Sequence, residues 1–159
     1  LIKNIQYVKD ANAEMNSLGN FNPADTAVVQ DRFKTSIPFE PVYDSTATIA
    51  LVKNDNDVIT YTFNAASNQF VVFSEIYYKS GWKAYIDEKE APIVKVNYVL
   101  RGLAIPAGKH DNKFEFKPQG YYKGKSITSI FSIVLLVVFA VGIFMEWRNR
   151  NQTALANRV

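Results

Sequence analysis

The residues of this chain best suited to ligand chemistry form an aromatic run, Tyr77, Tyr78, Trp82 and Tyr85, with Tyr98 downstream. Flat aromatic faces can stack on the apolar C–H faces of sugar rings, and their polar edges can hydrogen-bond to hydroxyl groups. Tyr78 and Trp82 straddle a Lys-Ser-Gly turn, which favours a surface role, although packing within a β-sandwich is the alternative explanation. The candidate glycan-contacting aromatic residues are Tyr77, Tyr78, Trp82 and Tyr98.

Arg101, which precedes Gly102, is the other polar residue of interest. Its guanidinium carries a fork of donors that suits either an anionic group of a ligand or an acidic side chain of the chain itself. The sequence leaves both roles open. We therefore add Arg101 to the candidate glycan contacts.

Residues suited to catalysis or metal binding are few. His110 is the single histidine and the chain has no cysteine, so a histidine or cysteine cluster around a metal is excluded. Asn54–Asp57 has oxygen ligands for Ca²⁺ but lacks the glycine and terminal glutamate of an EF-hand loop, and a hairpin turn explains it. We expect no catalytic residue, no metal and no cofactor in this chain.

Residues 126–145 are twenty residues without a charge. As an α-helix this segment is about 30 Å long, which matches the hydrocarbon thickness of a bilayer. A helix that is apolar on every side needs lipid or a large protein core, and the rest of the chain is too short to surround it. The flanks carry the aromatic and basic residues typical of membrane interfaces: Tyr121, Tyr122, Lys123, Lys125, Trp147, Arg148 and Arg150.

The charge around the apolar segment does not decide its direction. Five Lys lie within about 20 residues before it, and three Arg follow it at positions 148, 150 and 158. Counted alone, these charges place the preceding domain in the cytoplasm. Large domains, however, cross membranes largely regardless of charge, so the sequence leaves the topology open.

The preceding part of the chain reads as mainly β. A short helix is expected between the N-cap Asp10 and the stop at Gly19. Runs rich in β-branched and aromatic residues alternate with turn residues, which predicts an antiparallel β-sandwich of about seven or eight strands. The expected strands are residues 26–30, 47–53, 58–64, 69–78, 82–87, 91–96, 101–106 and 112–117.

We divide the chain into five segments on this basis. Residues 1–44 form a helix, strand and linker segment packed on the sandwich, and residues 45–118 form the sandwich itself. A juxtamembrane linker (119–125), the transmembrane helix (126–145) and a polar tail (146–159) follow. Residues 79–125 are basic, with 10 Lys or Arg against 5 Asp or Glu, but no recognition motif for nucleic acid accompanies the charge.

Three segments together resemble the C-terminal end of the bacterial YfhO-family membrane proteins: Glu75-Ile-Tyr-Tyr-Lys-Ser-Gly-Trp-Lys-Ala-Tyr-Ile-Asp87, Val96-Asn-Tyr-Val-Leu-Arg-Gly-Leu-Ala-Ile-Pro-Ala-Gly-Lys-His110 and Phe114-Glu-Phe116. The upstream stretch from Leu18 to Val29 is similar to Bacteroidetes-type members. The chain departs from the family pattern at Lys79-Ser80, where a proline usually precedes the glycine, and at Glu88, where glycine is common.

The resemblance implies a parent with many membrane helices, similar to glycosyltransferases that use polyprenyl-phosphate sugars as donors. The catalytic acidic residue of such enzymes lies in an early loop, so this chain would carry none. The implied location is the bacterial cytoplasmic (inner) membrane, with the β domain on the extracytoplasmic side and Arg148, Arg150 and Arg158 in the cytoplasm. The implied partners are the lipid bilayer, the parent's other transmembrane helices and a cell-envelope glycan or lipid-linked sugar.

Two functions follow as expectations. In the first, the domain is non-catalytic and positions a glycan acceptor for a lipid-linked-sugar glycosyltransferase, with the aromatic run and Arg101 as contacts. In the second, it is a structural or partner-binding module, and Tyr78 and Trp82 are buried in the sandwich. A stand-alone hydrolase would need an acid–base pair that the sequence does not offer.

Overall fold

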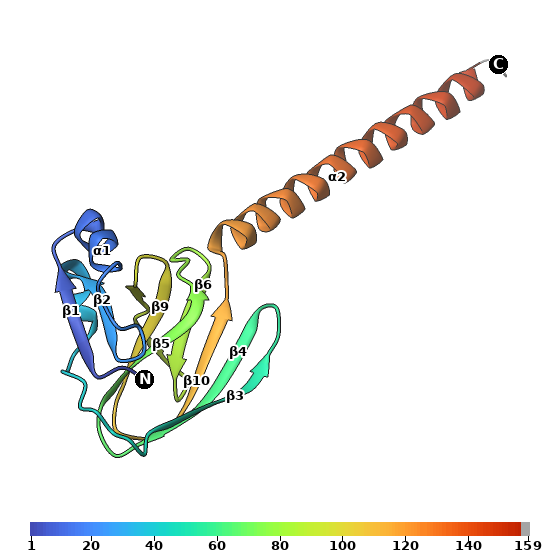
Figure 1. The fold of residues 1–159 in the computed structure, drawn as a ribbon. Coiled ribbons are helices and arrows are strands. Elements are labelled where there is room, and N and C mark those ends of the chain that lie inside the picture. Colours follow the sequence, from blue (N-terminus) through green and yellow to red (C-terminus); the bar gives the residue numbers. More distant parts are fainter. Residues whose placement is uncertain (157–159) are drawn as a thin grey trace. The chain divides into compact units, whose positions relative to one another are not determined.

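The computed structural model describes residues 1–156, with side chains for residues 1–118 and 120–146. It divides at Lys117 into a β-rich unit, Leu1–Lys117, and a helical unit that starts at Pro118 (Figure 1). The β-rich unit is called the β domain below. The candidate site residues all lie in the β domain.

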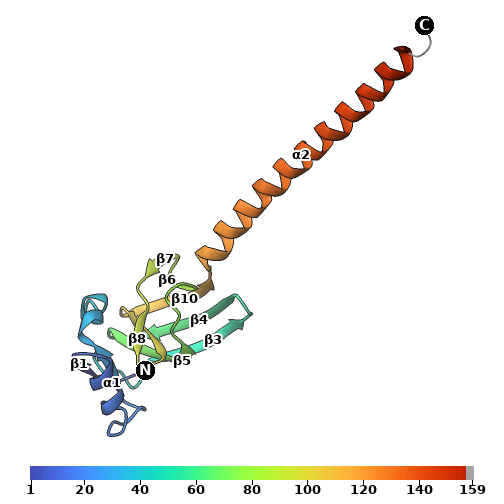
Figure 2. The ribbon, with the colours of Figure 1, turned by 90° about the horizontal axis from the view of Figure 1, so that it is seen from above.

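The β domain is built from two five-stranded sheets (Figures 1 and 2). Sheet A has the order β1-β2-β8-β9-β5, and sheet B has the order β3-β4-β10-β6-β7. Every paired neighbour is antiparallel except β1 and β2, which are parallel. The strands are β1 (Asn4–Val8), β2 (Thr26–Gln30), β3 (Thr48–Asn54), β4 (Val58–Ala65), β5 (Gln69–Ile76), β6 (Trp82–Ile86), β7 (Lys89–Ala91), β8 (Val94–Val96), β9 (Leu100–Ile105) and β10 (Gly108–Phe116).

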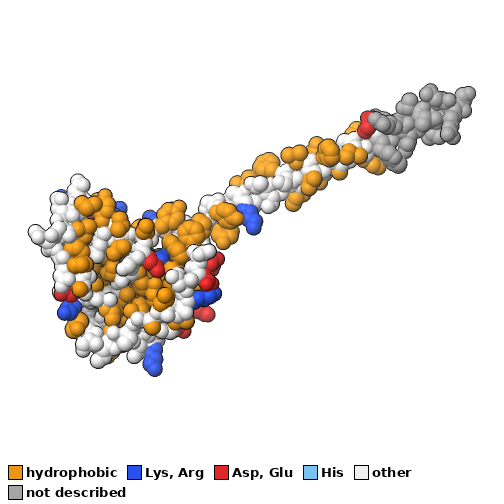
Figure 3. Space-filling model, turned by 45° about the vertical axis from the view of Figure 1, so that its right-hand side comes forward, with side chains coloured by type: hydrophobic (Ala, Val, Ile, Leu, Met, Phe, Trp, Pro, Cys, Tyr) orange, Lys and Arg blue, Asp and Glu red, His pale blue; other side chains and the backbone are white. Residues whose placement is uncertain are grey.

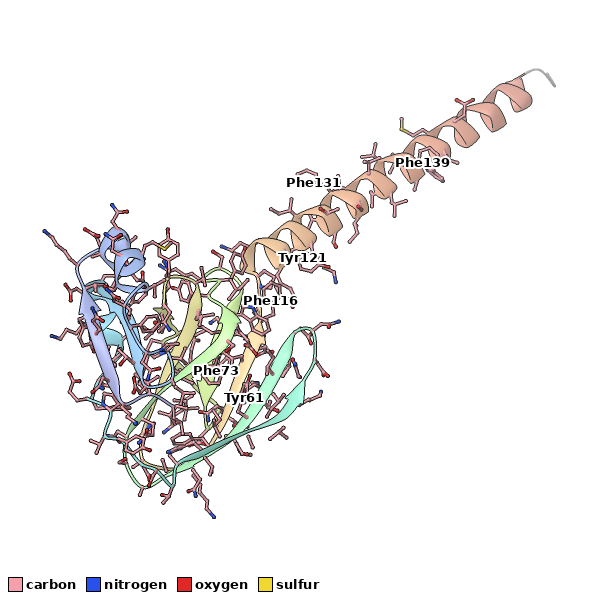
Figure 4. The ribbon with its side chains drawn as sticks, viewed as in Figure 1. Tyr61, Phe73, Phe116, Tyr121, Phe131 and Phe139 are labelled. Carbon is pink, nitrogen blue, oxygen red and sulfur yellow. The ribbon has the colours of Figure 1, made fainter. Side chains whose placement is uncertain are left out.

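The main core fills the space between the two sheets. Alternate residues of each strand point into it, as the two-residue period of a strand requires. Phe73 of β5 and Phe114 of β10 meet edge to face with their ring centroids 4.8 Å apart, and Tyr61 of β4 lies beside Phe73 (Figure 4). The buried residues of this core are Ile59, Phe63, Ala65, Val71, Phe73, Ala84, Leu103, Ile105 and Phe114.

Sheet A is buried on its second face as well, where a smaller core lies under the N-terminal segment. The 3₁₀ helix η1 (Asp31–Ser36) contributes Phe33 to this core. Gly102 of β9 allows the close packing there, because a Cβ at this position would come within 2.6 Å of the Phe70 ring. The buried residues are Ile2, Ala27, Val29, Ile37, Phe70, Val94 and Val96.

Helix α1 (Ala11–Ser17) is tied to sheet A by a buried carboxylate. Asp10 caps the helix by accepting a hydrogen bond from the Ala13 N–H at 2.9 Å. Glu14, which is fully buried, accepts hydrogen bonds from Gln30 Nε2 at 2.5 Å and from the Tyr98 N–H at 2.8 Å. Burying a charge is costly without partners, and here two donors and the nearby Lys95 supply them.

The second unit is helix α2 (Gln119–Ala156), which contains the predicted membrane segment 126–145. Residues 120–146 form a stretch long and apolar enough to cross a membrane, and none of its most apolar window is buried. Figure 3 shows hydrophobic side chains along this stretch, and Figure 4 shows Phe131 and Phe139 projecting from it. The side chains of the predicted interfacial and cytoplasmic residues Trp147, Arg148, Arg150 and Arg158 lie outside the described residues.

The predicted mainly-β sandwich with a short N-terminal helix and a C-terminal apolar helix is confirmed. The β domain has ten strands, where about seven or eight were expected. The predicted strand 91–96 is wrong, because Pro92 lies in a break between β7 and β8, which belong to different sheets. Strand β1 was not expected, because its sequence Asn-Ile-Gln-Tyr-Val is short and half polar.

Asn112 provides a test of how the main core is packed. It is 1% exposed on β10, and neither its Oδ1 nor its Nδ2 has a hydrogen-bond partner among the described residues. A buried amide without a partner costs free energy that an apolar side chain of similar volume avoids. We expect Asn112→Leu to raise the free energy of unfolding by about 1 kcal/mol in denaturant titrations.

The matched control for this prediction is Asn64→Leu, at an exposed position of the neighbouring strand β4, which should leave stability nearly unchanged. A loss of stability in Asn112→Leu that exceeds the change in the control would contradict the prediction.

Candidate functional site

Three of the predicted aromatic residues, Tyr77, Tyr78 and Trp82, line one surface groove of about 400 Å³. We call it the Trp82 groove. Its walls come from the β5–β6 turn, from η1 and from the chain between β7 and β8, so segments far apart in sequence meet there. The groove is lined by Arg32, Phe33, Ser36, Tyr77, Tyr78, Lys79, Trp82, Lys83, Ala84, Glu90, Ala91, Pro92 and Ile93.

A tight turn at Gly81 holds the Tyr78 and Trp82 rings against Phe116. The Gly81 and Trp82 N–H groups both donate to the Tyr78 carbonyl at 3.2 Å. A Cβ on Gly81 would come within 2.5 Å of the Tyr78 ring and 2.3 Å of the Phe116 ring, so only glycine fits without displacing them. The Phe116 centroid lies 6.2 Å from that of Tyr78 and 5.2 Å from that of Trp82. Phe116, labelled in Figure 4, is therefore the support of the groove's aromatic wall.

Tyr77 joins the groove from the side of η1. Its N–H donates to the Val99 carbonyl at 2.7 Å, and its ring meets Phe33 edge to face with centroids 6.0 Å apart. Burial raises the pKa of the Tyr77 phenol, against the opposing effect of the positive charge of Arg32. The phenol is thus a neutral donor and acceptor at physiological pH.

Two charged side chains of the groove pair with each other, and two others have no ion-pair partner among the described residues. Lys83 and Glu90 pair with each other across β6 and β7, with Nζ and Oε2 2.8 Å apart. The Arg32 guanidinium lies over the Phe33 ring, 4.9 Å from its centroid, and Lys79 sits in the turn beside Tyr78. The groove therefore combines aromatic faces, the ion pair between Lys83 and Glu90, and the two cations Arg32 and Lys79.

Arg101 is placed beneath the groove, where it is only 2% exposed. Its guanidinium forms an ion pair with Glu75, and its Cζ lies 4.4 Å from the ring centroids of both Trp82 and Phe114. Glu75 reaches it from a bulge in β5, between the pairs that Phe73 and Ile76 make with β9. Of the two roles that the sequence left open for Arg101, partnership with an acidic side chain is the one seen here.

The Arg101 side chain is shielded from water, whereas that of Glu75 is 26% exposed. Burial lowers the pKa of Arg101 to about 10, which still leaves the side chain protonated at neutral pH. The Tyr61 hydroxyl donates to the second oxygen of Glu75 at 3.0 Å. The cluster of Arg101, Glu75 and Tyr61 therefore supports Trp82 from below, through contacts that bridge the two sheets.

Tyr98 does not lie in the Trp82 groove. It occupies the tight turn between β8 and β9 with a φ of 69°, a conformation that bulky residues rarely adopt. The bond from its N–H to Glu14 and the bond from the Val28 N–H to Asn97 Oδ1 hold this turn. Lys95 Nζ covers the Tyr98 ring at 4.3 Å from the centroid.

His110 pairs with Asp87 and ties the β6–β7 turn to β10. The His110 Nδ1–H donates to Asp87 Oδ2 at 2.6 Å, and Asp87 Oδ1 accepts from the Asp111 N–H at 2.9 Å. These bonds hold the pKa of Asp87 below its ordinary value, the His110 bond being the largest cause. Asp87 itself has a φ of 47°, so the pair also holds a left-handed turn.

The sequence did not indicate several residues on which the groove depends. Arg32 and Phe33 come from a segment more than 40 residues away from Trp82, and no local pattern connects the two. Phe116 was expected in a strand with alternating residues. That pattern predicts which face of the sheet its side chain lies on, but not that it contacts Tyr78 and Trp82. Of these residues, Gly81 is the one that the sequence could have indicated, because a glycine close to aromatic residues often marks close packing.

The buried ion pair of Arg101 and Glu75 can be tested by substitution. We expect Arg101→Ala to lower the free energy of unfolding by about 3–5 kcal/mol, because it leaves the Glu75 carboxylate without its cation. The double variant Arg101→Met with Glu75→Leu should lose much less, since no charge is left alone. Denaturant titrations of the parent, of Arg101→Ala, of Arg101→Met and of the double variant would measure this, and equal losses in the single and double variants would contradict it.

The Asp87–His110 pair makes the stability of the β domain depend on pH. Because its pKa is lowered by folding, Asp87 stabilises the domain above its ordinary pKa of 3.8, and this contribution disappears as the pH falls through the lower pKa of the folded state. Asp87→Asn should therefore melt at a lower temperature than the parent at pH 6, and the difference should shrink below about pH 4. Asp57→Asn, in another turn, is the control. A difference that stays constant down to pH 2 would refute the assignment.

Comparison with known proteins identifies one family. The family model described as "Bacterial membrane protein YfhO" matches residues 42–128, which is more than half of the chain. The matched range runs from the linker before β3 through β10 into the first turns of α2. Neither the curated proteins nor the solved structures contain a significant match. The chain belongs to the YfhO family of bacterial membrane proteins.

Proposed function

We propose that the β domain is a non-catalytic, extracytoplasmic module of a multi-pass glycosyltransferase-like membrane protein, and that it positions a glycan in the Trp82 groove. The observation that carries the proposal is the groove itself, where Tyr78, Trp82 and Tyr77 present aromatic surface beside Arg32 and Lys79. Aromatic faces and adjacent polar groups are what a sugar ring requires.

The exposure of the aromatic residues supports a binding role over packing alone. Tyr78 is 52% exposed although its ring stacks on Phe116, and Trp82 is only partly buried although it rests on Arg101. A ring that is held on one face and open on another is preorganised, because little rotamer freedom remains to be lost on binding. Arg101 acts in this proposal as a positioning residue for Trp82, and Tyr98 lies outside the groove.

The arrangement along the chain supports a domain attached to a bilayer. We propose that residues 126–145 cross the inner membrane as the last helix of the parent, with residues 119–125 at its surface and the tail 146–159 in the cytoplasm. The family is one of membrane proteins. The parent's catalytic residue would lie outside this chain, on an earlier loop.

A purely structural or partner-binding module is the second candidate. The observation that favours it is strand β3, at the edge of sheet B, where Leu51 and Val52 are 54% and 63% exposed. Unpaired edges with apolar side chains commonly mark contacts with other protein segments. On this reading the Trp82 groove binds no glycan, and β3 contacts other parts of the parent.

The test is glycan binding by the full chain reconstituted in lipid nanodiscs. We expect binding to at least one cell-envelope glycan fragment on an array, confirmed by calorimetry, and a loss of affinity of about tenfold or more in Tyr78→Ala. Trp82→Ala should also lose binding, but its contacts with Arg101 and Phe116 mean that its melting temperature must be checked. Tyr43→Ala, an exposed aromatic substitution in the β domain outside the groove, is the matched control.

Two results would count against the proposal. Failure to bind any envelope glycan would favour the structural candidate. Binding that is unaffected by Tyr78→Ala in a protein of unchanged stability would show that the glycan lies elsewhere.

A further inference from the structure

The outer face of sheet B has a second hollow, which is larger than the Trp82 groove at about 600 Å³. Strands β3, β4, β10 and β6 lie side by side there (Figure 1). The inward residues Ile59, Ala84 and Phe114 belong to the main core. Their neighbours in sequence therefore point outward, since side chains alternate along a strand. A hollow of this size is within the range of small-ligand sites, about 300–1,000 Å³.

The strand register places three different functional groups in one row across this face. Lys113 of β10 pairs with Tyr85 of β6 on one side and with Thr60 of β4 on the other. Adjacent strands are about 4.8 Å apart, so the row Tyr85–Lys113–Thr60 is about 10 Å long. In the next row Asp111 of β10 pairs with Thr62 of β4. The face thus offers an aromatic ring, an ammonium group, hydroxyls and a carboxylate within a short span.

Most of these polar groups are unengaged. Within the described part of the chain, the Thr60 and Thr62 hydroxyls and the Glu88 and Asp111 carboxylates make no hydrogen bond or ion pair. Lys113 is the exception, with its Nζ 5.0 Å from the Tyr85 ring centroid and 3.6 Å from Glu115. A carboxylate accepts hydrogen bonds from sugar hydroxyls, and an ammonium or a threonine hydroxyl donates to them.

The charge of the hollow selects among glycans. Glu88, Asp111 and Asp87, the last of which is paired with His110, line it against Lys113, so its lining is acidic. Phosphorylated or uronic-acid polymers would be repelled, since like charges at close range are unfavourable. This balance is the reverse of that in the Trp82 groove, where Arg32, Lys79 and Lys83 outnumber Glu90.

We propose that the outer face of sheet B is a second binding site, which takes a short stretch of a neutral oligosaccharide with Tyr85 as its stacking platform and Asp111, Glu88 and Thr62 as its hydroxyl partners. The site does not depend on the Trp82 groove, because the two share no lining residue. If both are occupied, the domain holds one glycan chain at two points or two chains at once.

The experiment measures binding of three neutral hexasaccharides, cellohexaose, maltohexaose and mannohexaose, to the full chain in nanodiscs by calorimetry and saturation-transfer NMR. We expect at least one to bind, with Tyr85→Ala weakening it about tenfold and Tyr85→Phe keeping it within about twofold, because stacking needs the ring and not the hydroxyl. Thr62→Val and Asp111→Ala should each weaken binding as well. These positions face outward, and thermal melts of each variant check that the fold is retained.

The control is Tyr43→Ala, which removes an exposed tyrosine outside both hollows. The proposal is overturned if none of the hexasaccharides binds, or if Tyr85→Ala behaves like Tyr43→Ala. Binding that is lost in Tyr78→Ala but kept in Tyr85→Ala would also overturn it, while leaving the function proposed for the Trp82 groove intact.

Discussion

The interaction on which the β domain most depends is the burial of Arg101 between the two sheets. A guanidinium removed from water costs several kcal/mol, which only close partners can offset. Here the partners are Glu75 on the adjacent strand of sheet A and two aromatic rings of sheet B. The cation is thus the contact that fixes the position of one sheet over the other at this point. Trp82, which belongs to the candidate groove, takes its place from the same contact.

A comparable arrangement holds the β8–β9 turn, next to the start of β9. Glu14 is buried with donors from Gln30 and from the backbone of Tyr98. The turn that carries Tyr98 is held in a left-handed conformation, which stores strain unless the surroundings fix it. The β domain therefore uses two buried charges, one acidic and one basic, at points where strands must be held in a defined relation. Glu14 satisfies donors of the segments that face it, whereas the Nε and Nη1 atoms of Arg101 have no hydrogen-bond partner among the described residues.

Much of this fold could be predicted from local sequence. The alternation in Val58–Ala65 and in Phe114-Glu-Phe116, the Asp10 cap and the uncharged segment 126–145 are local signals, and each gave the correct element. The weaker elements escaped prediction: β1 is short and half polar, and the break at Pro92 separates two three-residue strands. Their formation depends on pairing with strands far away in the chain, which a local pattern does not encode.

The site was only partly predictable for the same reason. A run of aromatic residues around a turn indicated Tyr77, Tyr78 and Trp82, and these do line one groove. Tyr98 follows these residues in the sequence, but it lies in the β8–β9 turn. There its ring lies beside Lys95 and its N–H bonds to Glu14 of α1. The dipeptide Arg101-Gly102 does not indicate whether the arginine side chain is buried. Its burial depends on the bulge in β5 that brings Glu75 to it.

The connection between the two units has a mechanical consequence. Strand β10 runs directly into α2, with only Lys117 and Pro118 between them. It is also the central strand of sheet B, hydrogen-bonded to β4 on one side and β6 on the other. A pull transmitted along the chain from the helix is therefore resisted by two hydrogen-bonded ladders in parallel instead of peeling an edge strand. The last residue of β10 is Phe116, so the load passes first through the support of the aromatic groove.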